Sequence, residues 1–203
     1  MDPELNFETH IENTLKKARA MSGMIVRGIS HKSKDIMIPL YKALVRPVIE
    51  YGNAVWCPFK RKLIDKIEKV QQHFTRCIIG MGGLSYSERL EALGLPSLEF
   101  RRVRGDIIEV YKILNNIYDP VTTSSLLTLA DNSVTRAHSF KLLKPRVTTK
   151  HYQSFFSNRV INLWNSLPDF VVSSESVNML KYHVDLILDE YKYCVNFEIS
   201  IPN

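Results

Sequence analysis

The sequence predicts a mainly α-helical protein, with a helical bundle over residues 1–119 and a smaller α+β segment over residues 120–203. Apolar side chains recur every three or four residues over most of the chain, which is the period of an amphipathic helix. Glycine-containing turns and an Asp-Pro pair separate these stretches. With 203 residues, 45% of them apolar, the chain is also long enough to bury a core.

Two helices are expected at the N-terminal end. Residues 7–29 carry apolar side chains at helical spacing, so they predict the first helix. Ser33 or Asp35 is suited to begin the second, which runs through Val48. Pro47 is expected to kink or end it, because proline has no backbone N–H to donate.

Three further helices complete the expected bundle. The third spans about residues 61–79 and stops at Gly80. A short helix over residues 86–93 ends at a glycine in the same way. Ser97 caps the fifth, which is expected to continue as far as residues 119–120.

The C-terminal segment has a different pattern. Residues 140–149 are rich in β-branched side chains, which favours extended chain and predicts a short strand pair within the loop and strand region 132–152. Helices are expected over about residues 155–167 and 176–191, the second capped by Ser174 or Ser176.

Charge is sorted along the chain. Residues 132–168 contain six lysines and arginines and no acidic residue, whereas acidic residues outnumber basic ones after residue 168. This segregation suggests a surface for a polyanion, although a solvated basic loop is an equally open interpretation.

Residues for independent catalysis are not apparent. Two-metal nucleotidyl transfer needs clustered carboxylates, and the sequence has no paired aspartates. Tyr118 and Asp119 are followed at once by a proline, and the glycines at residues 80–83 lack the lysine of a phosphate-binding loop. The three cysteines have neither disulfide nor zinc-ligand spacing, so they are expected to be reduced thiols, with Cys77 in the core.

The third expected helix has a basic stripe. Its five basic side chains follow at spacings of four, three, four and three, which places them within an arc of about 80°. Leu63, Ile67 and Phe74 form a neighbouring apolar stripe, while Asp65 and Glu68 are expected on a third side. Sorted signs favour phosphate contact, and a solvated face is the alternative. The stripe consists of Lys62, Lys66, Lys69, His73 and Arg76.

The remaining basic candidates lie later in the chain. In the fifth helix Arg102 is expected to pair with Asp106, which leaves Arg101 and Arg104 for an external anion. Trp56 and Trp164 are expected to pack in cores rather than stack on bases, because they lie on apolar periodicity. The basic segment adds Arg136, Lys141, Lys144, Arg146 and Lys150 as candidate nucleic-acid-binding residues.

Several blocks of sequence follow one another in an order that matches a known protein family. The blocks are residues 40–52 with 55–58, 67–72, 95–99 with 101–102, 104–106 and 111–114, 136–139, and 155–160 with 164–168. Together they resemble the thumb and C-terminal end of reverse transcriptases from non-long-terminal-repeat (LINE-type) retrotransposons, of the jockey-like and chicken-repeat-like kinds.

The resemblance implies a helical thumb that grips an RNA–DNA template-primer hybrid and a C-terminal segment that engages template RNA or target DNA. It also implies that the fingers, the palm and the catalytic aspartates belong to sequence upstream of this chain. The fragment is therefore expected to lack polymerase activity of its own, since Mg²⁺ would bind the missing palm. Its expected partners are the hybrid and the missing palm and fingers.

An alternative remains open on the same resemblance. The chain is then a decayed or domesticated remnant, in which an apolar surface once covered by the palm serves as a protein-interaction module. No small-molecule substrate or cofactor is expected for this chain. No membrane association is expected either, because the sequence has no long apolar run and its N-terminus is acidic where a signal peptide would be basic. The expected location is intracellular, with nucleus and cytoplasm both open.

Overall fold

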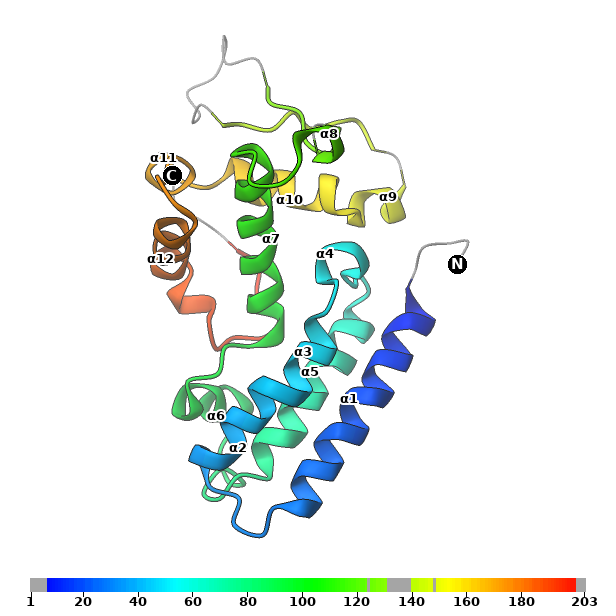
Figure 1. The fold of residues 1–203 in the computed structure, drawn as a ribbon, viewed down its shortest axis with the longest axis vertical. Helices are drawn as coiled ribbons and strands as arrows, with labels where there is room; N and C mark the ends of the chain where they lie inside the picture. The colour runs from blue at the N-terminus through cyan, green and yellow to red at the C-terminus, as the bar shows by residue number, and fades with distance from the viewer. Residues whose placement is uncertain (1–6, 124, 131–139, 148, 200–203) are drawn as a thin grey trace. The chain divides into compact units, whose positions relative to one another are not determined.

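The computed structural model describes residues 7–123, 125–130, 140–147 and 149–199, and it divides into two compact units (Figure 1). Unit 1 contains the chain up to Arg102 together with Lys192–Val195, and unit 2 contains the remainder. The boundary falls inside helix α7 (Leu98–Leu114). The division expected after residue 119 therefore does not coincide with this boundary. The mainly helical fold class is confirmed.

Unit 1 is built on two long helices that lie side by side. Helix α1 and helix α5 run in the same direction, because Lys60 at the start of α5 pairs with Glu8 and the Ile79 N–H beyond its end bonds to the Lys32 carbonyl (Figure 1). The helices of this unit are α1 (Glu8–Gly28), α2 (Lys34–Leu40), α3 (Arg46–Glu50), α4 (Asn53–Trp56), α5 (Arg61–Arg76) and α6 (Tyr86–Leu93).

The expected second helix passes through Pro47 without ending there. A π-helical turn, η1 (Tyr41–Val45), joins α2 to α3, and the Arg46 N–H bonds to the Tyr41 carbonyl five residues earlier. Pro47 then occupies the first turn of α3, where a missing N–H costs little. The wider π turn thus lets the chain stay helical as far as Glu50, so the helix does not end at Pro47.

Local capping signals set the ends of α5 and α6. Helix α5 ends at Arg76, slightly earlier than expected, and Gly80 beyond it adopts a φ of 82°. Ser85 and Glu88 form a reciprocal capping box at the start of α6. Gly94 closes α6 with a φ of 58°, a left-handed conformation that glycine adopts without strain.

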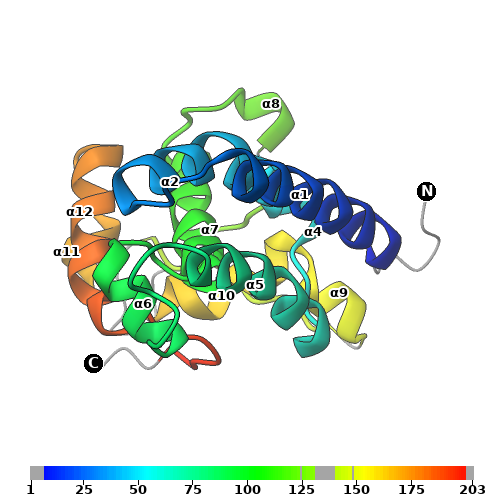
Figure 2. The same ribbon diagram turned by 90° about the horizontal axis from the view of Figure 1, so that it is seen from below.

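The core of unit 1 lies between α1, η1 and α5. Tyr41 and Phe74 face each other with ring centroids 5.0 Å apart, and the Tyr41 hydroxyl donates to the Gln71 side chain at 2.7 Å. Trp56 is buried, which confirms its predicted packing role, whereas Cys77 is half-buried rather than in the core. Figure 2 shows α6 beside α5, where the buried Arg89 bonds to the Gln72 carbonyl.

Unit 2 contains the remainder of α7 and a set of short helices. The expected helices over 155–167 and 176–191 correspond to α10 and α12, and the Ser176 side chain caps α12 by accepting from the Met179 N–H. Helices α8, α9 and α11 were not expected. The elements are α8 (Pro120–Thr123), α9 (Lys150–Ser154), α10 (Phe156–Asn165), α11 (Asp169–Val172), α12 (Val177–Ile187) and a 3₁₀ turn, η2 (Asp189–Tyr191).

Helix α7 ends at Leu114 instead of continuing to residues 119–120. Asn116 adopts a φ of 52°, and the Ile117 N–H bonds to the Lys112 carbonyl at 3.0 Å. The Asn116 N–H also bonds to the Ile113 carbonyl, so these contacts form a Schellman motif. Asparagine tolerates the left-handed conformation well enough to stop the helix here.

The expected strand pair is reduced, within the described residues, to one antiparallel bridge between Leu129 and Leu142. The backbone N–H and C=O of Leu142 bond to the side chain of Asn165 of α10. Its side-chain oxygen accepts from the Leu142 N–H at 2.8 Å, and its amide donates to the Leu142 carbonyl at 2.9 Å. An asparagine side chain thus replaces a further strand. Trp164 beside it is 1% exposed, as its predicted packing role requires.

A helix that spans a membrane needs about 20 predominantly apolar residues. Within the described ranges, no helix is both long and apolar enough to cross a bilayer.

Candidate nucleic-acid interface

The basic stripe lies on α5, away from its buried side. Leu63, Ile67 and Phe74 are at most 1% exposed, so this side of the helix is anchored in the core of unit 1. Lys62, Lys69, His73 and Arg76 are exposed, while Lys66 is half-buried. No carboxylate among the described residues lies within ion-pair distance of Lys62, Lys69 or Arg76. These three side chains can therefore meet external phosphates.

Lys66 differs from its neighbours because α1 supplies a partner. Its Nζ lies 2.8 Å from the Glu12 carboxylate. This hydrogen bond and charge lower the pKa of Glu12, and the charges of Lys62 and Arg19 lower it further. Lys66 therefore interrupts the stripe at neutral pH. An exposed pair of this kind contributes little to stability, so it forms and breaks easily.

Arg19 is an addition that the sequence pattern did not identify. It is exposed on α1 and lies near enough to Glu12 to affect its pKa. Because α1 and α5 are parallel neighbours, Arg19 extends the basic surface across the edge between them. Helical spacing on α1 could have indicated Arg19, but the packing that brings it beside α5 could not be inferred from periodicity.

Glu68 points away from the basic stripe, as expected, but it is buried. One of its oxygens accepts from the Tyr86 hydroxyl at 2.6 Å and from the Leu98 N–H at 3.1 Å. Burial raises the pKa of Glu68, while Tyr86 and the nearby Arg102 oppose that rise. Glu68 is thus a structural acid that ties α5 to the first turn of α7. Asp65, by contrast, pairs with Arg61 at 2.8 Å on the surface.

The arginines of α7 are engaged by internal carboxylates. Arg101 forms a two-point pair with Glu50 of α3, which raises the pKa of Arg101, and one of the two contacts is 2.9 Å. Arg104 forms a similar pair with Asp185 of α12, with one contact at 2.8 Å. The expectation that both remain available to an external anion is therefore not supported.

The expected pair between Arg102 and Asp106 is also wrong. Asp106 binds Arg159 of α10 through two contacts of 2.8 and 2.9 Å, and both side chains are largely buried. Arg102 is 6% exposed and acts on Glu68 instead. For Asp106, an arginine from another helix thus replaces the arginine one turn away, because the two-point geometry of its pair with Arg159 is more favourable.

The basic segment 132–152 is described only in part. Arg136 lies outside the described residues, as does the side chain of Lys150. Lys141 is half-buried, and Lys144 and Arg146 are exposed. No group of three His, Cys, Asp or Glu side chains suited to a metal ion occurs in the part of the chain that the structure describes.

Comparisons with known proteins name no activity. No protein-family model matches the chain, and no solved structure matches it. The sequence is similar to an uncharacterised protein of Caenorhabditis elegans, B0403.1, with 24% identity over 173 residues. The match covers 80% of this chain and 87% of the nematode protein, so it extends over most of both. The resemblance to reverse transcriptases stays a hypothesis.

Proposed function

We propose that this chain is a nucleic-acid-binding fragment of a non-long-terminal-repeat retrotransposon reverse transcriptase, equivalent to its thumb and C-terminal end. The observation that carries the proposal is the exposed row of Lys62, Lys69 and Arg76 on a helix whose opposite side is buried. A rigid row of cations without internal partners suits a phosphate backbone, which it contacts without regard to sequence.

The sequence blocks that resemble reverse transcriptases indicate which nucleic acid this surface binds. The block at residues 67–72 lies on α5 itself, so the resemblance and the charge distribution meet on the same helix. The partner is then an RNA–DNA template-primer hybrid. We further propose that the fragment does not catalyse polymerisation, and that the palm and fingers of the parent enzyme supply that chemistry.

The decisive experiment replaces Lys69 and Arg76 by glutamine together and measures binding to a labelled RNA–DNA hybrid as salt is varied. Each phosphate contact contributes about 0.7 to 0.9 to the slope of log K against log salt, so the slope should fall by about 1.4 to 1.8. Folding should be unchanged because both side chains are exposed.

A matched control removes two charges elsewhere in unit 1. Lys34 of α2 and Lys42 of η1 are both exposed, and replacing them by glutamine changes the net charge by the same amount. The control should leave the slope close to that of the parent protein. Equal losses from the two double variants would mean that only net charge matters, and the proposed surface would be rejected.

Catalysis has a separate test. The purified chain should extend no primer on an RNA or DNA template with Mg²⁺ or Mn²⁺. Reproducible nucleotide incorporation above a mock preparation would contradict the non-catalytic assignment without affecting the binding surface.

The protein-interaction alternative has one observation in its favour. Tyr51 is 84% exposed and Val55 is 68% exposed, and both lie in or beside the first resembling block. Large apolar side chains this exposed are typical of interaction surfaces when they are clustered. Binding through them should persist at high salt, whereas phosphate binding should not.

A further inference from the structure

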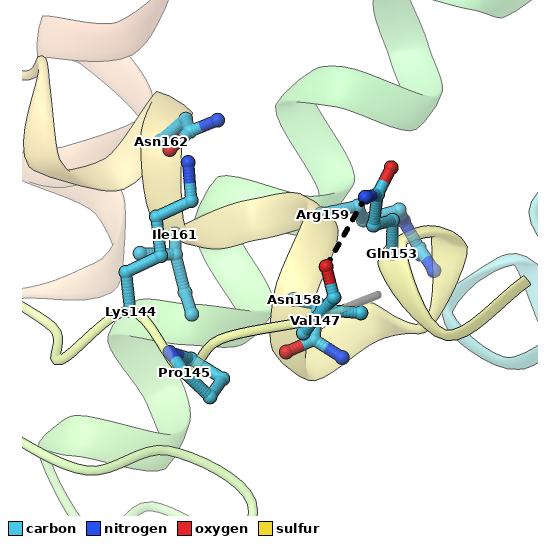
Figure 3. Close-up of a pocket in the computed structure, with 8 residues that line it drawn as sticks. All are labelled: Lys144, Pro145, Val147, Gln153, Asn158, Arg159, Ile161 and Asn162. Carbon is cyan, nitrogen blue, oxygen red and sulfur yellow. Dashed lines mark hydrogen bonds between the residues drawn. The ribbon is translucent and has the colours of Figure 1, made fainter. Parts of the chain in front are cut away.

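Unit 2 contains a cavity that none of the preceding assignments uses. It has a volume of about 260 Å³ and lies between the extended segment at residues 144–147 and helices α9 and α10 (Figure 3). Its wall is formed by Lys144, Pro145, Val147, Gln153, Asn158, Arg159, Ile161 and Asn162. Most of these side chains are polar, which distinguishes the cavity from a packing defect.

The polar wall combines one available cation with several amides. Lys144 is exposed and has no carboxylate within ion-pair distance among the described residues. Gln153 donates to the Val147 carbonyl at 3.5 Å (Figure 3). Asn158 donates to the Tyr152 carbonyl at 2.6 Å. Both amides keep acceptor oxygens as well as further N–H groups. Such a mixture of donors and acceptors matches the edge of a heterocyclic base.

Arg159 has a supporting role in this wall. Its guanidinium is held by Asp106 and also donates to the Ser154 carbonyl at 3.2 Å. The arginine therefore fixes the first turn of α10 in place, and Lys144 is the cation that can reach a ligand.

A second hollow adjoins the first, and four leucines are among the residues that line it. It has a volume of about 170 Å³ and shares Pro145, Asn158 and Ile161 with the polar cavity. Tyr152 also lines it; this residue is 53% exposed, and its ring lies edge-on to Phe155 at 5.7 Å between centroids. An exposed aromatic ring of this kind offers a stacking surface for a base.

The N-terminus of α10 adds an electrostatic field that favours a negative group. Ser157 lines the second hollow, Asn158 lines both hollows, and both residues lie in the first turn of this ten-residue helix. No side chain caps that end. The positive end of the helix dipole therefore favours a negative group beside the cavity.

We infer that the two hollows form one binding site for a nucleotide of a single-stranded nucleic acid. The base lies against Tyr152 and the leucines of the second hollow, the amides of Gln153 and Asn158 contact its edge, and Lys144 binds an adjoining phosphate. A duplex keeps its bases stacked inside, so it cannot place one here. The inference rests on the proposed function for its partner class, but it uses different residues in a different unit.

The test compares two double variants of unit 2. Lys144→Gln with Tyr152→Ala removes the cation and the stacking ring of the site. Lys181→Gln with Tyr182→Ala removes the same groups from α12, where Tyr182 is 62% exposed. Each protein is titrated against a labelled single-stranded oligothymidylate and against an RNA–DNA hybrid of equal length, and folding is checked by circular dichroism.

The site variant should bind the single strand at least about fivefold more weakly than the parent, because base–aromatic stacking alone accounts for that much. Its affinity for the hybrid should change little, and the control variant should resemble the parent on both ligands. Equal weakening by the two variants, or no weakening by the first, would overturn the site. Lys69→Gln with Arg76→Gln should weaken hybrid binding instead, so failure of the proposed function is distinguishable.

Two further measurements keep the outcome interpretable. If Tyr152→Ala lowers helicity, Tyr152→Phe tests the ring without disturbing its packing and should retain near-parental affinity. Thymidine monophosphate serves as a competitor. Tight binding of the free nucleotide without measurable binding of the oligomer would overturn the assignment to a strand.

Discussion

Helices α5 and α7 carry similar basic sequences but use them in opposite ways. On α5, Lys62, Lys69 and Arg76 face solvent without internal partners among the described residues. On α7, Arg101 and Arg104 are bound by carboxylates that other helices supply. Both helices have the spacing of an amphipathic helix, so the spacing did not distinguish them.

The difference teaches how to interpret a basic helix face. A cation that meets a well-placed carboxylate holds its own helix to another one and contributes to stability. A cation without such a partner contributes little to stability and keeps its charge for a ligand. The acidic residues that decide between the two roles lie far away in the sequence.

The largest expected effect concerns the pair that joins α7 to α10. Replacing Asp106 by alanine leaves the largely buried Arg159 without its partner, which should lower the free energy of unfolding by about 3 kcal/mol. Urea denaturation followed by circular dichroism measures this. Asp106→Ala combined with Arg159→Ala should cost less than the two single changes together. Strict additivity would indicate that the pair contributes nothing.

An effect of intermediate size distinguishes the roles of α5 and α7 directly. Arg101→Gln should lower stability by about 1 to 2 kcal/mol, since it breaks a charge-assisted pair with Glu50. Lys69→Gln should change stability by less than about 0.5 kcal/mol, because its side chain is exposed. Lys69→Gln should weaken binding of the hybrid more than Arg101→Gln does. A larger binding loss from Arg101→Gln would erase the contrast between α5 and α7.

The smallest expected effect is the pH dependence at Glu12. Its pKa is lowered in the folded protein, so its contribution to stability is present above its unfolded pKa and is lost as pH falls through the folded pKa. NMR titration of the Glu12 carboxyl carbon should show the lowered pKa, and Lys66→Gln should return it toward its usual range. A titration that Lys66→Gln leaves unchanged would mean that the pair does not persist in solution.

Glu12 also provides a test of hybrid binding by the basic surface. Glu12→Gln releases Lys66 and removes a negative charge from the edge between α1 and α5, so hybrid binding should strengthen modestly. Glu68→Gln is no substitute for it as a charge variant, because Glu68 is buried and bonded to Leu98 and Tyr86.

The sequence by itself determined the local features of this protein. The helical class, the glycine that ends α6, the serine caps of α7 and α12 and the buried apolar side of α5 follow from spacing and from residue types at helix ends. These features depend on contacts within a few residues, which periodicity records. Periodicity could not predict the π turn before Pro47 or the asparagine that ends α7, because each depends on a specific hydrogen-bond arrangement.

Only the tertiary structure decided which charges are available. The carboxylates that bind Arg101, Lys66 and Arg104 lie 51, 54 and 81 residues away along the chain. The same holds for the Asn165 side chain, which occupies Leu142 and leaves a single bridge in place of a strand pair. Ion pairs and hydrogen bonds act over a few ångströms, so their partners are fixed by packing, and a helical period contains no information about which distant residue packing brings near.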